Sequence, residues 1–482
     1  MDWPYQAAPE AHFMTVTVTR RLTISPDGDL IDLANEERVD YAPISNESTI
    51  QKISDAYGRV VGDYSNEIFI NIVVKKLEWQ GLISNADDLE LATHKGIDAN
   101  IWNEIVRSIK GGNLSLILYL KDWFLSSLLF FISLVALPIK CIASLLLAGR
   151  CKNDLNTFSI IRSDASYDKI RAVSHELGIV MLSEDIVYRN IKLGSVFSYV
   201  QKFNFIKGIP ALVLQAISDY MELRKELERF VSYRCAQRFM LYYSPRIVAK
   251  CCFERLLINI LEKNSTDMVT GNKEDRYAMV EKRVVKKFNR KLTCIPHGLE
   301  YSYKFPAGLA GDVFFCTSQK SLEVLSSLYK TNVFVLDSAL NKKIYSRRGP
   351  SKEHKSIERV VFFTEPRDID VNRQILDCLN HSAVPFRVKL HPNDNSGNYD
   401  GYDLTFVDSL PDALTYPISI ARKSTILLNA AYLGNMAVAV LIDSKDLFYA
   451  TYVFPSLSDV RIINITNQHD FKFTLNGLNS NV

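Results

Sequence analysis

The feature that most constrains the fold is an alternation of short apolar runs and helical segments that begins near residue 157. Segments of this kind, each run ending in polar or turn residues before the next helix, are typical of a parallel, doubly wound sheet. Helices are expected at 168–177, roughly 195–234, 247–261 and 275–288. The strands expected in this first unit are 158–161, 178–182, 239–243, 267–270, 292–295, 313–315 and 333–336.

A second alternation follows a basic, turn-rich interval at 341–355, which we interpret as a domain boundary. Its functional interpretation is attraction to an anionic membrane or a charged acceptor glycan, and the alternative is a solvated linker. A cleft between two such sheets is a natural place for a ligand. The strands expected in the second unit are 359–363, 384–390, 404–407, 418–420 and 437–442.

The predicted fold class is therefore α/β, with two Rossmann-like doubly wound domains, a helical N-terminal region and a hydrophobic membrane-seated segment. The expected divisions are a mainly helical region at 1–112, a hydrophobic membrane-associated segment at 113–152, an acceptor domain at 153–340, a linker at 341–356 and a nucleotide-donor domain at 357–482.

Composition is that of a globular chain long enough for two or three domains: 482 residues, 47% hydrophobic and 23% charged. A net charge of +3 argues against a protein that binds nucleic acid by neutralising its backbone. The eight cysteines are scattered without a zinc-binding pattern, so we expect reduced, buried thiols. The first residues lack a basic segment followed by an apolar one, which predicts no signal peptide and a cytoplasmic location.

The N-terminal third contains one informative segment. Around the turn at 25–28 we expect a hairpin or a loose arm, and helices at 46–82 and 98–109. Residues 123–139 then carry no charge, and apolar residues continue beyond Lys140 to Leu147. A membrane-spanning helix needs about 20 apolar residues. The alternatives are a buried pair of core helices, a spanning helix, and the one we favour, a hairpin seated in the membrane and broken at Pro138.

Polar residues follow several of the expected strands directly, at 296–298, 364–366, 389–392 and 422–425. Ligands of open α/β sheets lie outside the carboxyl ends of the strands, and a helix beginning at 424 would present free N–H groups to a phosphate. Taken singly, a histidine at a strand end or a Ser-Thr pair at a helix start is more often structural. The residues that we expect to bind a nucleotide donor are Lys389, His391, Pro392, Thr364, Glu365, Arg422, Ser424 and Thr425.

Two motifs carry a resemblance to a known class of enzymes. Lys-Leu-His-Pro-Asn-Asp at 389–394 and Ser-Thr-Ile-Leu-Leu-Asn-Ala-Ala-Tyr-Leu-Gly at 424–434 are similar to motifs of bacterial two-domain (GT-B) glycosyltransferases that assemble surface polysaccharides. The most similar groups are the sialyltransferases, with the polysialyltransferase-like group, and the Kdo-transferases. The resemblance covers about 239–442 and implies that both motifs hold the cytidine monophosphate part of a CMP-sugar.

The sequence departs from these families at the expected catalytic base. The sialyltransferases have an acidic pair before a glycine, whereas Pro-His-Gly stands here at 296–298. His-Gly resembles instead the teichoic-acid polymerases, in which this histidine is implicated as base and the donor is CDP-glycerol or CDP-ribitol. His297 is therefore the candidate base, with Glu300 as a second catalytic candidate and Asp164 and Asp185 as other carboxylates. No pair of acidic residues suggests a metal site, so we expect neither metal nor cofactor.

The expected function is transfer of an acidic sugar, sialic acid or Kdo-like, from a CMP-activated donor to a growing capsule or lipopolysaccharide. The expected partners are the nucleotide-sugar donor, a glycan or glycolipid acceptor and the inner-membrane surface, to which the protein would be peripheral or monotopic. A polyol-phosphate transferase with a CDP donor is the first alternative. A non-catalytic membrane-associated scaffold is the second.

Overall fold

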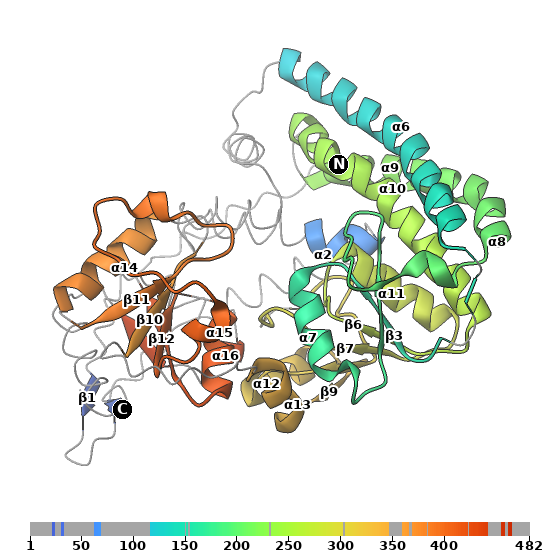
Figure 1. Ribbon diagram of the computed structural model, residues 1–482. Coiled ribbons are helices and arrows are strands. Elements are labelled where there is room, and N and C mark those ends of the chain that lie inside the picture. Colours follow the sequence, from blue (N-terminus) through green and yellow to red (C-terminus); the bar gives the residue numbers. More distant parts are fainter. Residues whose placement is uncertain are drawn as a thin grey trace.

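The computed structural model describes residues 22–24, 30–32, 62–68, 116–149, 151–152, 155–230, 233–301, 304–346, 359–365, 369–382, 384–422, 424–441, 455–457 and 461–464. In these residues the chain forms an α/β fold with two separate parallel sheets and a long apolar helix (Figure 1). The expected helices at 98–109 and in most of 46–82 lie outside the described residues.

The first sheet has the strand order β5-β4-β3-β6-β7-β8-β9, and all neighbouring strands are parallel. The chain winds outward from β3 through β5 and then returns to place β6 on the other side of β3, so the topological switch point lies between β3 and β6. The strands are β3 (Phe158–Ile161), β4 (Val180–Ser183), β5 (Gly194–Ser195), β6 (Met268–Thr270), β7 (Leu292–Cys294), β8 (Val313–Phe315) and β9 (Val333–Val335).

The helices of this domain begin where polar residues follow the strands. Ser163, Asp275, Ser318 and Asp337 each accept a hydrogen bond from a backbone N–H three residues later, which stabilises the first turn of the helix. The helical elements are α7 (Asp164–Ser174), η5 (Val196–Tyr199), α8 (Lys202–Lys207), α9 (Ile209–Phe230), α10 (Tyr233–Lys263), α11 (Arg276–Lys287), α12 (Gln319–Leu328) and α13 (Ser338–Tyr345).

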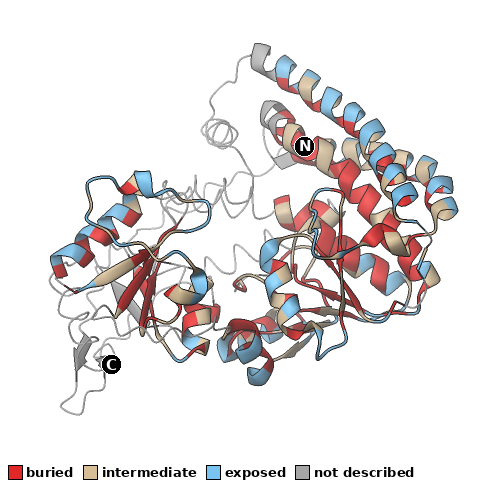
Figure 2. Cartoon of the chain, in the orientation of Figure 1, coloured by how far each residue is buried: buried red, intermediate tan, exposed pale blue. Residues whose placement is uncertain are grey.

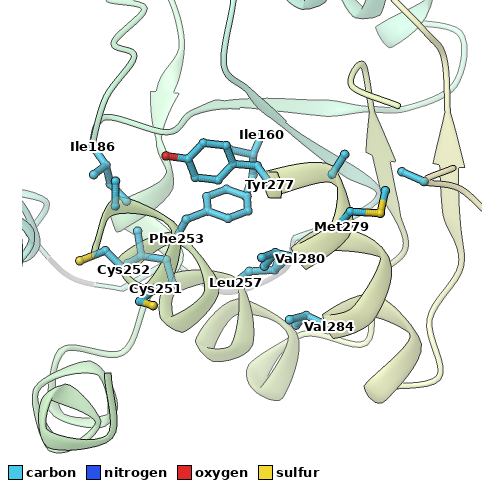
Figure 3. Packing of buried hydrophobic residues seen from close by; sticks show 14 of the residues in the cluster. Ile160, Ile186, Cys251, Cys252, Phe253, Leu257, Tyr277, Met279, Val280 and Val284 are labelled. Carbon is cyan, nitrogen blue, oxygen red and sulfur yellow. The ribbon is translucent and has the colours of Figure 1, made fainter. Parts of the chain in front are cut away.

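The core of this domain lies between the sheet and the helices α10 and α11. Phe253 of α10 and Tyr277 of α11 pack edge to face, with ring centroids 5.2 Å apart, and Ile160 of β3 belongs to the same cluster (Figure 3). Figure 2 shows that α10 is buried along much of its length beneath other helices. A helix covered on several sides needs apolar residues on several sides, and this explains its long apolar stretches.

The second sheet has the order β11-β10-β12-β13-β14, again with all neighbours parallel. Its switch point lies between β10 and β12. The strands are β10 (Val360–Phe363), β11 (Phe386–Lys389), β12 (Ile418–Ala421), β13 (Met436–Leu441) and β14 (Arg461–Asn464). The helical elements are α14 (Ile369–Ser382), η6 (Ser396–Tyr399), α15 (Leu410–Ala413), α16 (Ile426–Tyr432) and η8 (Pro455–Leu457).

The two domains share one buried apolar cluster. It includes Ile295 and Leu299 on either side of His297, together with Phe363 and Ala421 at the ends of β10 and β12. Polar contacts reinforce the junction: the Tyr432 hydroxyl donates to the carbonyl oxygen of Thr317 at 2.7 Å. The carboxyl ends of the two sheets are therefore connected through packed side chains.

The N-terminal described segments are a hairpin, a short helical turn and one long helix. Strands β1 (Leu22–Ile24) and β2 (Leu30–Asp32) pair antiparallel around the predicted turn at 25–28, as a hairpin requires. The 3-10 turn η2 (Gly62–Tyr64) and α2 (Ser65–Ile68) contact the first domain, where Glu67 forms an ion pair with Arg276 at 2.9 Å. Helix α6 (Leu116–Leu147) packs against α10.

Two of the expected strands are wrong. Residues 239–243 belong to α10 and are not a strand, because the buried faces of this helix obscure its periodicity. Pro245 lies inside the same helix, and neighbouring side chains satisfy carbonyl groups there: Ser244 Oγ donates to Met240 at 2.5 Å and Arg246 to Tyr242 at 2.7 Å. The expected strand 404–407 makes only an isolated bridge, between Val388 and Phe406.

The expected break at Pro138 is also wrong, and a helix crosses the expected start of the linker at residue 341. Helix α6 continues through Pro138, so it is one helix and not a hairpin. A proline removes a single backbone hydrogen bond, and α6 has buried residues on both sides of it, Phe130 and Cys141 among them. Helix α13 runs across residue 340, and Lys343 forms an ion pair with Glu176 in the turn after α7. The start of the expected linker is thus structured.

Candidate functional site

The residues after β10 and β11 that were expected to bind a donor lie side by side. Phe363 pairs in register with Lys389, so the two strands end at the same level of the sheet. The backbone N–H of Thr364 donates to the carbonyl of Lys389, and the Thr364 hydroxyl accepts from the backbone N–H of His391, both at 3.1 Å. Thr364 is buried and therefore positions the His391 loop more than it presents a group to a ligand.

The His391 ring is exposed at this edge. Its Nδ1 accepts from the backbone N–H of Asn393 at 3.1 Å, so in the neutral ring Nε2 carries the proton and can donate to an anion. Asp394 holds the loop in place by accepting from the Tyr399 hydroxyl at 2.6 Å. Pro392 is exposed beside the histidine. Lys389 is half-buried, and its Nζ donates to the carbonyl of Leu390 at 3.0 Å.

The residues after β10 and β12 meet at the switch point of the second sheet. Arg422 and Glu365 are both buried and form an ion pair at 3.7 Å. The side chain of Asn372 further holds the backbone of Glu365, with Nδ2 donating to its carbonyl at 2.7 Å. Because its charge is neutralised by Glu365, the Arg422 guanidinium attracts a phosphate less strongly. We therefore interpret the pair as holding the ends of β10 and β12 in place.

Ser424 and Thr425 lie at the start of α16. The Ser424 hydroxyl accepts from the backbone N–H of Ile426 at 3.3 Å, which is a local capping contact. Thr425 makes no capping bond with its side chain. Because α16 contains only seven residues, its N-terminus contributes a smaller dipole than the sequence motif suggested.

His297 follows β7 at the carboxyl edge of the first sheet. Its backbone N–H and its Nδ1 both contact the carbonyl oxygen of Gly271, at 3.1 and 2.6 Å. A carbonyl oxygen only accepts, so Nδ1 carries the proton and Nε2 of the neutral ring carries a lone pair. Burial lowers the pKa of His297, and the positive charge of Lys273 acts in the same direction. These are the protonation state and tautomer that a general base requires.

Gly271 brings the end of β6 unusually close to the first turn of α7. A Cβ atom at this position would lie 2.7 Å from the Cβ of Ser166, which is closer than side chains can approach. Gly271 therefore allows the contact between the two elements at the switch point and places its carbonyl oxygen against His297.

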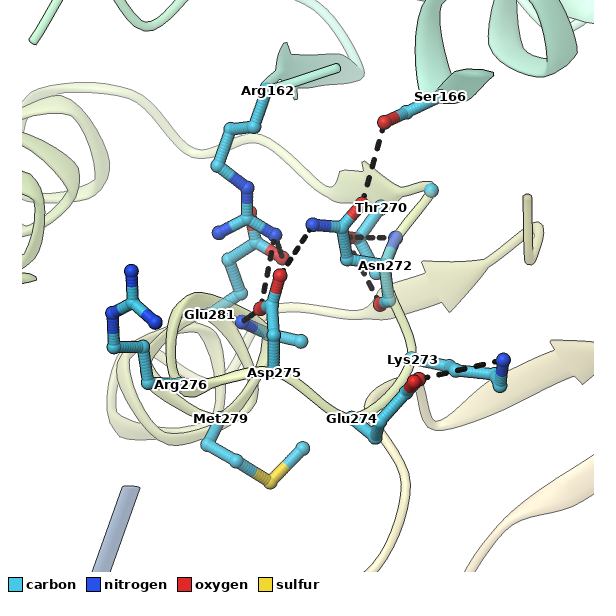
Figure 4. Close-up of polar contacts among 12 residues, drawn as sticks. Arg162, Ser166, Thr270, Asn272, Lys273, Glu274, Asp275, Arg276, Met279 and Glu281 are labelled. Carbon is cyan, nitrogen blue, oxygen red and sulfur yellow. Dashed lines mark hydrogen bonds and ion pairs between the residues drawn. The ribbon is translucent and has the colours of Figure 1, made fainter. Parts of the chain in front are cut away.

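Sequence reasoning missed Lys273, which lies beside His297. It is buried, its Nζ lies 4.9 Å from the Tyr301 ring centroid and 3.5 Å from the Glu274 carboxylate, and a Cβ at Gly298 would lie 3.5 Å from that Nζ. The polar run at 272–275 directly after β6 was the available signal, because β6 and β7 are neighbours in the sheet (Figure 4).

A charge cluster in which Arg162 and Glu281 are buried lies next to this edge (Figure 4). Arg162, at the end of β3, forms ion pairs with Asp275 at 3.6 Å and Glu281 at 3.4 Å. Burial raises the pKa of Glu281 to about 7, and Arg162 opposes that rise. Asn272 Nδ2 donates to Asp275 at 2.6 Å, which ties the 271–275 loop to the cluster.

Glu300, the second catalytic candidate, is held in a buried network. Its carboxylate accepts from the Thr317 N–H at 2.8 Å, from the Thr317 hydroxyl at 2.5 Å and from the hydroxyls of Ser321 and Ser456. A carboxylate with so many donors and 1% exposure is poorly placed to accept a substrate proton. We therefore assign Glu300 a structural role, linking the first domain to η8.

The other two carboxylates lie on the opposite side of the switch point. Asp164 accepts from the Tyr188 hydroxyl at 2.5 Å, and Asp185, with a φ of 60°, accepts from Ser183 Oγ at 2.6 Å. Both follow β3 or β4, whereas His297 follows β7.

Comparison with family models and with curated proteins finds no match for this chain. The two strand edges described above are therefore the features from which a function is proposed.

Proposed function

We propose that this protein is a transferase that moves an acidic sugar from a cytidine-nucleotide donor to a hydroxyl group of a surface glycan. The observation that carries the proposal is the state of His297, a neutral imidazole whose Nδ1 is fixed by Gly271 and whose Nε2 is available as a base. It lies at the carboxyl edge of one parallel sheet, and the edge of the second sheet is connected to it through shared packing.

In the proposed reaction, Nε2 of His297 takes the proton of the acceptor hydroxyl as its oxygen bonds to the anomeric carbon of the donor. The bond between that carbon and the phosphate oxygen breaks, and CMP leaves with the electron pair. Lys389 and the Nε2–H of His391 would stabilise the charge on the departing phosphate. Burial, with the Lys273 charge acting in the same direction, lowers the pKa of His297 and so favours the neutral ring before the acceptor arrives.

A CDP-dependent polyol-phosphate transferase is the second candidate, and one observation favours it. At the position where sialyltransferases are expected to use a carboxylate, the available base is a histidine, and the nearby Glu300 is fully engaged. In this reaction the acceptor oxygen would attack phosphorus instead of carbon, and CMP would again leave.

Calorimetric titration with CMP, CDP, UDP and GDP tests the donor class. We expect CMP to bind and His391→Ala to weaken binding at least about tenfold through loss of one charge-assisted hydrogen bond. The matched control is His381→Ala, an exposed histidine of α14 on the same domain, which should bind normally. Preference for UDP or GDP contradicts the cytidine assignment, and binding of no nucleotide favours the scaffold.

Transfer assays with His297→Ala separate binding from catalysis. This variant should bind CMP like the wild type but lose transfer by about 10²–10⁴-fold, the usual contribution of a general base. Because the pKa of His297 is lowered, the acidic limb of the rate profile should lie below pH 6.5, the ordinary value for histidine. Phosphorus in the product distinguishes polyol-phosphate transfer from sugar transfer.

A further inference from the structure

Helix α6 buries several small or polar residues and exposes most of its large apolar residues. The side buried against the protein includes Asp122, Ser126 and Ser133, which are at most 9% exposed. The outward side carries large apolar residues that are each 37% exposed or more: Leu120, Trp123, Phe124, Leu128, Leu129, Phe131, Ile132, Val135, Ile139, Leu146 and Leu147. A helix that faced water would show the reverse pattern. Small and polar residues toward protein with large apolar residues outward are typical of a helix that faces lipid.

Neighbouring elements extend this exposed surface. Helix α8 contributes Phe203 and Ile206, and α9 contributes Leu214 and Met221. Both helices contact α6, and the rings of Phe130 on α6 and Tyr220 on α9 lie 4.3 Å apart. Lys140 Nζ of α6 also donates to the carbonyl of Ile186 in the loop after β4, at 2.7 Å. The loop after Ile186 adds Val187 and Ile191, which are 70% and 86% exposed. Figure 2 shows α6 at the outer side of the domain with exposed positions along its length.

Most of the charges beside this surface are positive, although the carboxylate of Glu222 is exposed next to Met221. The chain between Asp185 and Asp219 contains four basic residues and no acidic residue. Lys192 and Lys207 are exposed directly beside Ile191 and Ile206. On α6, Lys121 and Lys140 are exposed while the only carboxylate, Asp122, is buried. Basic residues among apolar ones match a bilayer with anionic headgroups.

We propose that the outward face of α6, with α8, α9 and the 187–191 loop as its rim, seats this protein in the surface plane of an anionic lipid bilayer. The binding partner of this face is a lipid surface. The proposal does not depend on the transfer reaction. It differs from the sequence expectation because it names one continuous helix and a rim from three other elements as the lipid contact.

The packing of α6 favours an in-plane position over a span. By length and composition, Leu120–Leu147 is the one helical segment in the described part of the chain that could cross a membrane. A 32-residue helix is about 48 Å long, whereas the hydrocarbon core is about 30 Å thick. Beside it, α10 carries Lys250 in an ion cluster with Asp63 and Asp219, at 3.0 and 2.7 Å. A spanning α6 would draw this helix into hydrocarbon, where buried charges are costly.

The first test is sedimentation of the full chain with vesicles of phosphatidylcholine alone and of phosphatidylcholine with an equal amount of phosphatidylglycerol. We expect binding to the anionic vesicles that weakens at high salt. The double variant Phe203→Ser/Ile206→Ser should bind roughly tenfold more weakly or worse, because two apolar side chains no longer enter the bilayer. Val135→Ser/Ile139→Ser on α6 should have a similar effect.

Matched controls use exposed residues away from this surface. Val333→Ser/Leu410→Ser replaces two apolar side chains that are 59% and 44% exposed on other elements, and it should bind vesicles like the wild type. Lys192→Glu/Lys207→Glu should lose the preference for anionic vesicles, and Lys330→Glu should keep it. Circular dichroism confirms folding of each variant. Equal binding by all variants, or no binding by the wild type, would overturn the proposal.

Three further measurements test how α6 lies relative to the bilayer and whether lipid or a second protein copy covers its outward face. Brominated lipid should quench the tryptophan fluorescence of the wild type by a larger fraction than that of Trp123→Phe, and equal quenching would contradict insertion of Trp123. An impermeant maleimide added outside the vesicles should label both Leu120→Cys and Leu147→Cys, whereas protection of one end would mean a span and refute the in-plane position. Sedimentation velocity without lipid tests the alternative that a second copy of the protein covers this face. A stable dimer that is lost in Phe203→Ser/Ile206→Ser would support that alternative and contradict the lipid contact.

Discussion

Replacement of Glu281 by glutamine should remove a defined part of the pH dependence of stability. The carboxyl group is completely buried on α11 and contacts only the guanidinium of Arg162, at 3.4 Å, among the ion pairs described. Burial raises its pKa from 4.5 to about 7. The folded protein therefore holds a proton on Glu281 in a pH range in which the unfolded chain has released it.

The magnitude follows from the two pKa values. A rise from 4.5 to about 7 corresponds to about 3 kcal/mol, because each tenfold change in the protonation equilibrium is worth about 1.4 kcal/mol. This stability is fully present below pH 4.5, is lost as the pH rises toward about 7, and changes no further above that. Glutamine has a similar shape and no titration, so Glu281→Gln lacks this contribution to the slope.

Urea unfolding of both proteins from acidic pH to about pH 8 measures the effect. The free energy of unfolding of the wild type minus that of Glu281→Gln should fall by about 3 kcal/mol over this range. Burial also raises the pKa of Glu184, but this residue is present in both proteins, so its contribution cancels in the difference. Glu323→Gln, at an exposed carboxyl of α12, gives the baseline. A flat difference would show that Arg162 keeps Glu281 ionised and would refute the reasoning.

Three other substitutions test packing and positioning. Phe253→Ala, in the centre of the first core, should lower the free energy of unfolding by about 3–5 kcal/mol in urea titrations. Tyr432→Phe removes a 2.7 Å hydrogen bond between the domains and should cost about 1–2 kcal/mol in the same measurement. Gly271→Ala creates a contact of 2.7 Å with Ser166 and should cost about 1–3 kcal/mol. Because it also moves the carbonyl that holds His297, transfer should fall more than CMP affinity, and an unchanged rate would contradict the positioning role.

Much of the α/β architecture could be predicted from the sequence because its strands are buried on both faces. Continuous apolar runs such as 158–161 and 313–315 appear in the structure with the same ends. The capping residues after these strands act within a few positions of the chain, so local patterns are enough to place the helices. The same patterns failed at 239–243, where a helix covered on several sides looks locally like a buried strand.

The candidate site was predictable only as a set of strand ends. Thr364 lies against His391 because β10 and β11 are parallel neighbours that end at the same level of the sheet. The alternation of strands and helices in the sequence implies such parallel strands. The sequence could not distinguish His297 from Glu300, since both follow β7 within a few residues. Partners distant in the chain decide between them: Gly271 leaves Nε2 of His297 available, whereas Thr317 and Ser456 occupy the Glu300 carboxylate.

For the long apolar helix, the sequence by itself determined that residues 123–139 avoid water, because transfer of so much apolar surface is unfavourable in any fold. It did not determine whether protein or lipid would cover them. Only the tertiary structure decided which side of α6 is buried, and that side holds Asp122, Ser126 and Ser133. The physical reason is that burial is a property of the partner surface, and the partner here lies more than a hundred residues away along the chain.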